Sequence, residues 1–215
     1  MNIIIIGPPG SGKGTQSKFI SKKYGIKHIC TSNLIRNYIK KSSKCNINYK
    51  KIISSGKLLN DKIVISFVKS RITKKDCNNG FILDGFPRTY NQAIYIKKLG
   101  IKFDYIIFLS IPDKIIIDRI IYRKIHIPSG RIYNSKFNPP KCEGKDDITG
   151  ELLITREDDQ EHILKKRLIE YHKNNNNLLN FYYNEFLIGK NKFVVIDATK
   201  KIEEIIKDII NIIVV

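Results

Sequence analysis

A run of glycine, lysine and hydroxyl side chains near the start of the chain could bind phosphate: GPPGSGKGT at positions 7–15. The glycines let successive backbone N–H groups turn toward one anion, and Lys13 adds a positive charge beside them. Residues 2–6, an asparagine and four β-branched isoleucines, predict a strand before the run, and residues 15–24 predict a helix after it. The run would therefore lie at a helix N-terminus, whose dipole also favours an anion.

The position after Lys13 departs from the general phosphate-loop pattern. That pattern has Ser or Thr there as a ligand for Mg²⁺, whereas this chain has Gly14 and brings its hydroxyl one residue later, at Thr15. We therefore expect phosphates and water to hold the metal, with less direct help from the loop.

A carboxylate and a guanidinium close another predicted strand, residues 80–84, in the sequence LDGFPRT at positions 83–89. Parallel sheets bind ligands beyond the carboxyl ends of their strands, so Asp84 and Arg88 should face the phosphate loop. A carboxylate suits the water shell of Mg²⁺, and a guanidinium suits bidentate contact with phosphate. Taken alone, Asp84 could equally be a turn or helix-capping residue.

The elements that must position these groups alternate along the chain. Short buried-strand patterns alternate with helical patterns, which is typical of an α/β fold with a parallel sheet between two layers of helices. The predicted strands are residues 2–6, 27–30, 80–84, 104–109 and 192–197, and the predicted helices include residues 15–24, 60–71, 91–99 and 202–213.

Two stretches interrupt this alternation. Residues 31–59 are polar and helix-forming, whereas residues 122–159 contain several prolines and glycines and lack a helical period. The second stretch has enough apolar side chains to predict a small folded subdomain rather than a disordered loop. These side chains are Ile127, Ile132, Tyr133, Phe137, Ile148 and Leu152.

Two patterns mark the C-terminal part of the chain. The asparagine run at 174–177 predicts an exposed weak point within a long helix. Isoleucines spaced i, i+3, i+4 and i+7 over residues 202–213 could mark a membrane-surface helix. Such a stripe is far more often the face of a helix that packs on a sheet, which is what we expect here.

The composition excludes several classes of protein. Of the 39 basic residues 31 are lysines, and against 20 acidic residues they give a formal net charge of +19. The lysines are scattered, which favours a solvated surface over a nucleic-acid-binding face, since that face needs clustered charge and aromatic platforms. A hydrophobic content of 42% excludes a disordered chain, and no apolar run approaches the roughly 18 residues of a membrane span.

The four cysteines predict neither a zinc knuckle nor a disulfide scaffold, because no two of them have CxxC spacing. We expect reduced thiols in a cytoplasmic protein. Because the first predicted strand begins at residue 2, we also expect no cleaved targeting segment before it. The cysteines are Cys30, Cys45, Cys77 and Cys142.

Several motifs together resemble the adenylate kinase family in its long-lid form. Besides GPPGSGKGT and DGFPRT at 84–89, the chain has HIPSGR at 126–131, YNSKFNPPK at 133–141, GKDD at 144–147 and TREDD at 155–159, and the helix around residues 167–171 also fits. The resemblance covers nearly all 215 residues. It implies reversible phosphoryl transfer, ATP + AMP ⇌ 2 ADP, with Mg²⁺, in a monomer that binds ATP, AMP and ADP but neither nucleic acid nor a membrane.

The resemblance also implies how the chain is divided. A core domain with the phosphate loop and a five-stranded parallel sheet flanked by helices would comprise residues 1–29, 60–121 and 160–215. Residues 30–59 would form an AMP-binding insertion, and residues 122–159 would form a lid insertion over ATP.

Matching the family's motifs implies the site residues. The ATP side comprises Gly10, Ser11, Gly12, Lys13, Gly14, Thr15, Arg119, Ile132, Tyr133 and Lys200. The AMP side comprises Thr31, Arg36, Lys57, Leu58, Leu59, Gly85, Phe86, Pro87, Arg88, Gln92, Arg156 and Arg167. Gln92 would hydrogen-bond adenine, and Arg36 and Arg88 would hold the α-phosphate. The residues implied to act on the transferring group are Lys13, Arg88, Arg123, Arg156 and Arg167, with Asp84 holding Mg²⁺ through water.

The use of arginine gives a further argument. Six of the eight arginines fall on positions that the family uses for phosphate, which leaves only Arg71 and Arg131. Although this chain mostly uses lysine for positive charge, it has arginine at the positions where a planar donor can bind two phosphate oxygens at once.

The resemblance implies that the lid of this chain holds no zinc. Relatives with structural zinc have four ligands, mostly cysteines, where this chain has Gly130, Tyr133, Gly150 and Leu153. The positions of the hydrogen-bonded network that replaces zinc in other members hold His126, Ser129, Asp146 and Thr149. On this interpretation Cys142, although it lies in the lid, is not a zinc ligand.

Three residues depart from the family pattern. Ser32 and Asn33 stand where Gly-Asp is usual, and Ala198 stands where glycine is common. Asn33 lacks a negative charge that would favour the start of the following helix.

Two alternatives stay open from the sequence. A GTP:AMP phosphotransferase would keep the same AMP side and change only its contacts to the donor base. UMP/CMP-type kinases usually have a short lid, so the long 122–159 insertion weighs against them. A nucleic-acid-binding protein is the more distant alternative that the charge of +19 suggests.

Overall fold

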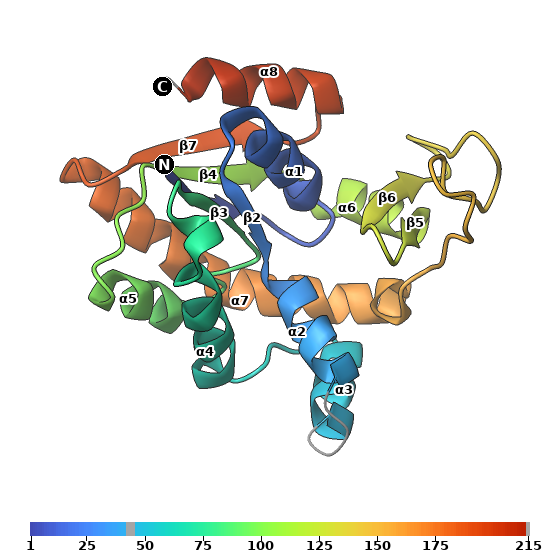
Figure 1. Ribbon diagram of the computed structural model, residues 1–215, viewed down its shortest axis with the longest axis horizontal. Helices are drawn as coiled ribbons and strands as arrows, with labels where there is room; N and C mark the ends of the chain where they lie inside the picture. Colours follow the sequence, from blue (N-terminus) through green and yellow to red (C-terminus); the bar gives the residue numbers. More distant parts are fainter. Residues whose placement is uncertain (42–45, 214–215) are drawn as a thin grey trace.

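Within the described residues, 1–41 and 46–213 of this computed structural model, five parallel strands form the central sheet (Figure 1). Ile4 on the middle strand lies opposite Leu83 and Ile106 on its two neighbours, and all three are fully buried. Burial on both faces explains why these strands are continuous apolar runs. The predicted strands and α/β fold are confirmed. The strand order is β2 (Lys27–Cys30), β3 (Phe81–Asp84), β1 (Asn2–Ile6), β4 (Tyr105–Ser110) and β7 (Lys192–Asp197).

Helices cover both faces of the sheet, with α8 above it and α7 below it in Figure 1. One core contains side chains of α1 (Lys13–Tyr24), α6 (Asp113–Ile121) and α8 (Ile202–Ile212). The other contains side chains of α4 (Asp61–Ile72), α5 (Tyr90–Lys98) and the C-terminal half of α7 (Glu161–Leu187). The four helices predicted above begin and end within two residues of these bounds.

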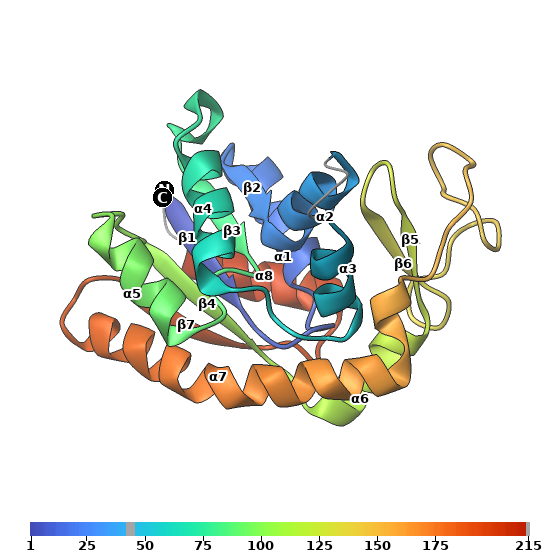
Figure 2. The same ribbon diagram turned by 90° about the horizontal axis from the view of Figure 1, so that it is seen from below.

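Two helices lie between β2 and α4 and extend away from the sheet (Figures 1 and 2). They are α2 (Thr31–Lys41) and α3 (Asn46–Ser54), which agrees with the helix-forming composition of residues 31–59. Residues 42–45, which include Cys45, lie outside the described ranges. The 3₁₀ helix η1 (Lys75–Cys77) leads from α4 into β3.

The 122–159 segment stands to one side of the sheet, where α7 begins (Figure 2). Its strands β5 (Arg123–His126) and β6 (Arg131–Asn134) form an antiparallel pair, and an isolated bridge joins Ile125 to Ile154. The 3₁₀ helix η2 (Glu157–Asp159) ends the segment.

The apolar residues expected to hold this segment together do not do so. Phe137 is 58% exposed, and Ile148 and Leu152 are each 75% exposed; of the six apolar residues, all within the described ranges, only Tyr133 is buried. The segment is too small to build an apolar core, so strand pairing and polar contacts order it instead.

The C-terminal expectations had mixed outcomes. In α8, Ile205 and Ile209 are buried against the sheet, which confirms the predicted packing. The asparagine run is only partly exposed, because α7 continues through it unbroken and turns Asn175 inward, where it is buried. In the described part of the chain, no helix combines the length and apolar character that crossing a membrane requires.

Candidate active site

A cleft of about 790 Å³ opens beyond the carboxyl ends of β1, β2 and β3. The phosphate loop, residues 30–59, the 122–159 segment and α7 all contribute to its lining. Of the residues implied above for ATP, AMP and phosphoryl transfer, all of them described, only Phe86 does not line the cleft. The ring of Phe86 is instead buried in the core beneath it.

The phosphate loop depends on two glycines with left-handed backbone angles. Gly10 has φ of 81° and Gly12 has φ of 91°, values that favour glycine over any L-residue. A Cβ on Gly10 would also lie 2.8 Å from the side chain of Ile120. Helix α1 begins directly after this turn, and its first turn carries no acidic residue. The positive end of its dipole therefore stays available to an anion.

Lys13 folds back onto this loop. Its Nζ donates to the carbonyl oxygens of Gly7 and Pro8, each at 2.7 Å. Burial lowers the pKa of Lys13 to about 7; the charge of Asp84 acts against this shift, and the charge of Arg88 adds to it. The ammonium therefore lacks a strong anionic partner until a phosphate group arrives.

Two buried carboxylates hold three of the arginines around the cleft. Arg123 donates to Asp159 through both Nε, at 2.8 Å, and Nη2. Arg36 Nη2 donates to Asp158 Oδ2 at 3.0 Å. Arg167 Nη1 lies 3.2 Å from the same carboxylate oxygen and also donates to the backbone carbonyl of Asp158 at 2.9 Å. Donors from α2, β5 and α7 are thus oriented before any ligand binds.

The carboxylates leave the site strongly positive. Burial lowers the pKa of Arg156 and of Arg167 to about 10, so both still carry a charge at neutral pH. Burial alone would raise the pKa of Asp158, but the charges of Arg167 and Arg36 hold it below its usual value. A concave site of this charge attracts polyanions.

Two further arginines contact the positions that depart from the family pattern. Arg88 donates through Nε to the Gly85 carbonyl at 2.8 Å and through Nη2 to Ser32 Oγ at 3.0 Å. Arg119 donates to the backbone carbonyl of Ala198 at 2.7 Å. Ser32 and Ala198 therefore each contact an arginine of the cleft, and neither replaces a positively charged residue there.

Asp84 lies at the floor of the cleft, next to the phosphate loop. Its Oδ2 is 3.1 Å from His28 Nε2. Burial would raise the pKa of Asp84, but the hydrogen bond from His28 and the charge of Lys13 hold it below its usual value. A Cβ on Gly14 would lie 3.4 Å from Asp84 Oδ2, so glycine at position 14 keeps space open in front of an ionised carboxylate.

The wall formed by α2 and α5 presents polar atoms to the cleft. Within the described ranges, Thr31 Oγ1 and Arg36 Nη1 are buried without a hydrogen-bond partner. Two hydrogen bonds orient the side-chain amide of Gln92. Its Oε1 accepts from the backbone N–H of Arg88 at 2.8 Å, and its Nε2 donates to Asp61 Oδ1 at 2.7 Å. Unpaired buried polar atoms of this kind are expected where a ligand completes the bonding.

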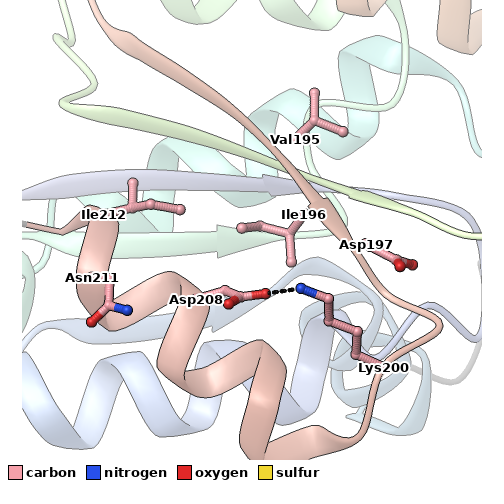
Figure 3. A pocket seen from close by; sticks show the side chains of 7 residues that line it. All are labelled: Val195, Ile196, Asp197, Lys200, Asp208, Asn211 and Ile212. Atoms are coloured by element: carbon pink, nitrogen blue, oxygen red, sulfur yellow. Dashed lines mark hydrogen bonds and ion pairs between the residues drawn. The ribbon is translucent and has the colours of Figure 1, made fainter.

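Lys200 lies at the opposite rim, between the cleft and a second hollow beside β7 and α8 (Figure 3). Its Nζ donates to Asp208 Oδ2 of α8 at 2.7 Å. The ammonium is therefore tied to α8 rather than directed at the phosphate loop.

Polar side chains order the 122–159 segment and bring together His126, Ser129, Asp146 and Thr149. His126 Nδ1 is 2.7 Å from Ser129 Oγ, and Thr149 Oγ1 donates to Asp146 Oδ2 at 3.0 Å. Arg131 also donates to Asp146, at 2.7 Å through Nε, and this contact holds the pKa of Asp146 well below its usual range.

Replacing Asp146 by asparagine is expected to loosen this segment selectively. The change removes the charge that Arg131 and the Tyr133 hydroxyl share, while the size of the side chain stays the same. Hydrogen exchange measured by mass spectrometry should become about tenfold faster or more across residues 122–159 and stay unchanged in the central sheet. The exposed Glu143→Gln is the matched control, and equal exchange in both variants would contradict the assignment.

The sequence interpretation missed the carboxylates that orient the arginines, and also part of the segment's network. Asp158 and Asp159 belong to the TREDD motif, but adjacent acidic residues also occur at 146–147 and 203–204, so the sequence does not single them out. Arg131 was set aside, yet it anchors Asp146. Glu151, which contacts His126 Nε2, and Asp61 had no local signal, because their partners are 25 and 31 residues away.

Comparisons with known proteins agree with this geometry. The sequence model of the family described as adenylate kinase matches residues 5–187. A curated protein named "Adenylate kinase" from Sodalis glossinidius (strain morsitans) is 46% identical over 205 residues, which cover 95% of this chain and 96% of that protein.

Proposed function

This chain belongs to the adenylate kinase family, and from that membership we propose how its cleft transfers a phosphoryl group from ATP to AMP to give two ADP. The observation that carries the proposal is the placement of arginine. Of the eight arginines, all within the described ranges, six line one cleft whose floor is the phosphate loop. The other two form ion pairs elsewhere, Arg71 with Asp76 and Arg131 with Asp146.

The chemical step requires no nucleophilic side chain. An oxygen of the AMP α-phosphate attacks the γ-phosphorus of ATP while the bond from that phosphorus to the β-phosphate oxygen breaks, so both products are ADP. Lys13 and the helix N-terminus hold the ATP phosphates, and Arg88, Arg123, Arg156 and Arg167 surround the group in transit. Catalysis then consists mainly of positioning and charge stabilisation, and positioning alone is worth about 7–11 kcal/mol.

The residues present fit a magnesium ion carried by ATP. When bound, Mg²⁺ would neutralise part of the charge on the phosphate groups during transfer. Asp84 is ionised and faces the space that Gly14 leaves open, which suits a hydrated ion held through water rather than directly. Thr15, at the helix start, is the first hydroxyl residue after Lys13 in the sequence, and it lines the cleft.

We assign the two nucleotides to opposite walls. Thr31, Arg36 and Gln92 belong to the AMP side, where two buried polar atoms await a partner. Arg119, Tyr133 and Lys200 belong to the ATP side. On this assignment residues 30–59 and 122–159 are insertions on a core formed by the rest of the chain.

The 122–159 segment acts as a lid in this proposal. Closing lids that exclude water are established for adenylate kinases as a class, and exclusion matters because water would otherwise accept the phosphoryl group. Lys18 Nζ of α1 donates to the Gly130 carbonyl at 2.6 Å, which gives the lid a contact on the core. Gly130, Gly150 and Leu153 carry no metal-binding side chain, so we propose a lid that holds no zinc.

Three further properties complete the proposal. The chain acts as a monomer, does not bind nucleic acid, and works in the cytoplasm, where the free thiols of Cys30, Cys77 and Cys142 would stay reduced.

A matrix of donors and acceptors tests the function. Coupled assays would pair ATP, GTP and CTP with AMP, UMP and GMP, with Mg²⁺ throughout. We expect ATP with AMP to be the fastest pair by a wide margin. Faster transfer from GTP to AMP would favour the GTP:AMP phosphotransferase, and transfer confined to UMP would overturn the assignment of the AMP wall.

The pKa of Lys13 predicts that nucleotide binding takes up a proton. With a pKa of about 7 in the empty site, this lysine is mostly neutral at pH 8, and the arriving triphosphate raises its pKa. Affinity for ATP should therefore fall as pH rises above 7, by up to about tenfold per unit. Calorimetry at pH 8 in two buffers of different ionisation enthalpy measures the uptake, and Lys13→Arg, which is always charged, should abolish it.

A further inference from the structure

Three potential metal ligands meet beneath the phosphate loop, and the proposed function uses only one of them. His28, Cys30 and Asp84 each offer one ligand atom, and these atoms all lie within 4.8 Å of one another. The closest pair, His28 Nε2 and Asp84 Oδ2, is 3.1 Å apart. All three residues line the cleft, so an ion can reach them from solvent. No second cluster of three such residues occurs in the described ranges.

The sheet itself fixes this cluster. His28 and Cys30 are two residues apart on β2, so their side chains leave the same face of the strand. Asp84 ends β3 directly opposite Cys30 in the parallel register. A tetrahedral ion with bonds of about 2.0–2.3 Å separates its ligand atoms by about 3.3–3.7 Å. Side-chain rotation therefore has to close the widest gap by only about one ångström.

We propose that His28, Cys30 and Asp84 form a site for a soft divalent cation of the zinc class, with its fourth position open to the cleft. Thiolate and imidazole select such ions, whereas Mg²⁺ demands oxygen ligands. On binding, the Cys30 thiol gives its proton to solvent and the sulfur forms a bond to the metal. Lys13 and Arg88 lie nearby and oppose any cation, so only an ion that gains a strong bond to sulfur is retained.

Occupation of this site is expected to inhibit phosphoryl transfer. The ion engages Asp84 directly and withdraws it from the water shell of Mg²⁺. This consequence rests on the proposed function, whereas the binding itself does not, so the two are tested by separate readouts.

Binding is tested with Cd²⁺ alone, without nucleotide or Mg²⁺, through the ultraviolet thiolate-to-cadmium absorption. The wild-type chain should show one saturable tight component that Cys30→Ser abolishes and that Cys142→Ser, at an exposed cysteine, retains. His28→Gln keeps the thiol and should weaken the component tenfold or more. A tight component that survives in Cys30→Ser, or no saturable component in wild type, would overturn the proposal. If Cys30→Ser does not fold, undiminished affinity in His28→Gln would overturn it equally.

Inhibition is tested with Zn²⁺ in the ATP-plus-AMP assay at excess Mg²⁺. With the activity of each chain measured relative to its own value without Zn²⁺, Cys30→Ser should resist Zn²⁺ at concentrations that inhibit wild type by tenfold. Equal inhibition of both chains would refute the inhibitory consequence. If wild type forms no ADP at all, the proposed function fails while the cadmium result still decides the metal site.

Discussion

Replacing Arg88 by lysine is expected to lower kcat by about 10²–10³-fold while the protein remains folded. Arg88 reaches the cleft from the end of β3, and the Gly85 carbonyl and Ser32 hydroxyl orient its Nε and Nη2. Lysine keeps the charge but loses the planar pair of donors that can hold two phosphate oxygens at once. Steady-state kinetics with varied AMP measures the effect, and circular dichroism checks the fold.

Arg71→Lys is the matched control. Arg71 forms a bidentate pair with Asp76 at 2.8 Å and does not belong to the residues that line the cleft. The same chemical change there should leave kcat within about twofold of wild type. Activity of Arg88→Lys within threefold of the Arg71→Lys value would refute the claim that arginine geometry at this cleft is catalytic.

Replacing Lys13 by alanine is expected to reduce kcat/KM for ATP by about 10²–10³-fold or more. Lys13 is the charge that the phosphate loop directs at the ATP phosphates. Lys18, which also lines the cleft from α1, donates instead to the Gly130 carbonyl at 2.6 Å and does not replace it. Thermal stability should stay the same or rise slightly, because burial of the ammonium, which lowers the pKa of Lys13, works against its charged form in the folded protein.

Lys22→Ala provides the control on the same helix. Lys22 is exposed in the last turn of α1, so its removal should leave turnover unchanged. Near wild-type kcat/KM in Lys13→Ala, or a collapse of its melting temperature, would contradict the role assigned to this lysine.

The sheet was predictable because its signals are local. Ile3 to Ile6 form a β-branched run that ends in glycine and proline, and the neighbouring strands β3 and β4 have comparable apolar patterns. The edge strands β2 and β7 are more polar and more exposed. Full burial on both faces imposes such a composition, so the pattern and the structure have the same cause. The phosphate loop was predictable for a similar reason, since left-handed angles at Gly10 and Gly12 require glycine.

The 122–159 segment was predicted to be folded on a physical argument that was wrong. Apolar content suggested a small core, yet Ile148 and Leu152 face solvent and the order comes from Asp146 and its partners. Hydrogen-bond networks leave no periodic trace in a sequence, because their members need only meet in space. Glu151 contacts His126 across 25 residues, and nothing in the sequence near either one indicates it.

The cleft was predictable in its cations and not in its carboxylates. Arginine is rare in this chain, so its positions carried information, whereas Asp158, Asp159 and Asp61 resemble ordinary surface acids in the sequence. Only the fold reveals that Asp158 and Asp159 are buried and that they hold Arg36, Arg123 and Arg167 in place. The burial of Asn175 on the inner face of α7 was hidden in the same way, because the residue lies within a polar run.

The most direct test of this account follows the phosphoryl group itself. ATP labelled at its γ-phosphate is incubated with AMP, Mg²⁺ and the purified chain, and the products are separated. Direct transfer in a closed cleft predicts that the label appears at the β-phosphate of ADP, with two ADP formed for each AMP consumed. Label released as inorganic phosphate, or ATP left intact while AMP persists, would contradict the account.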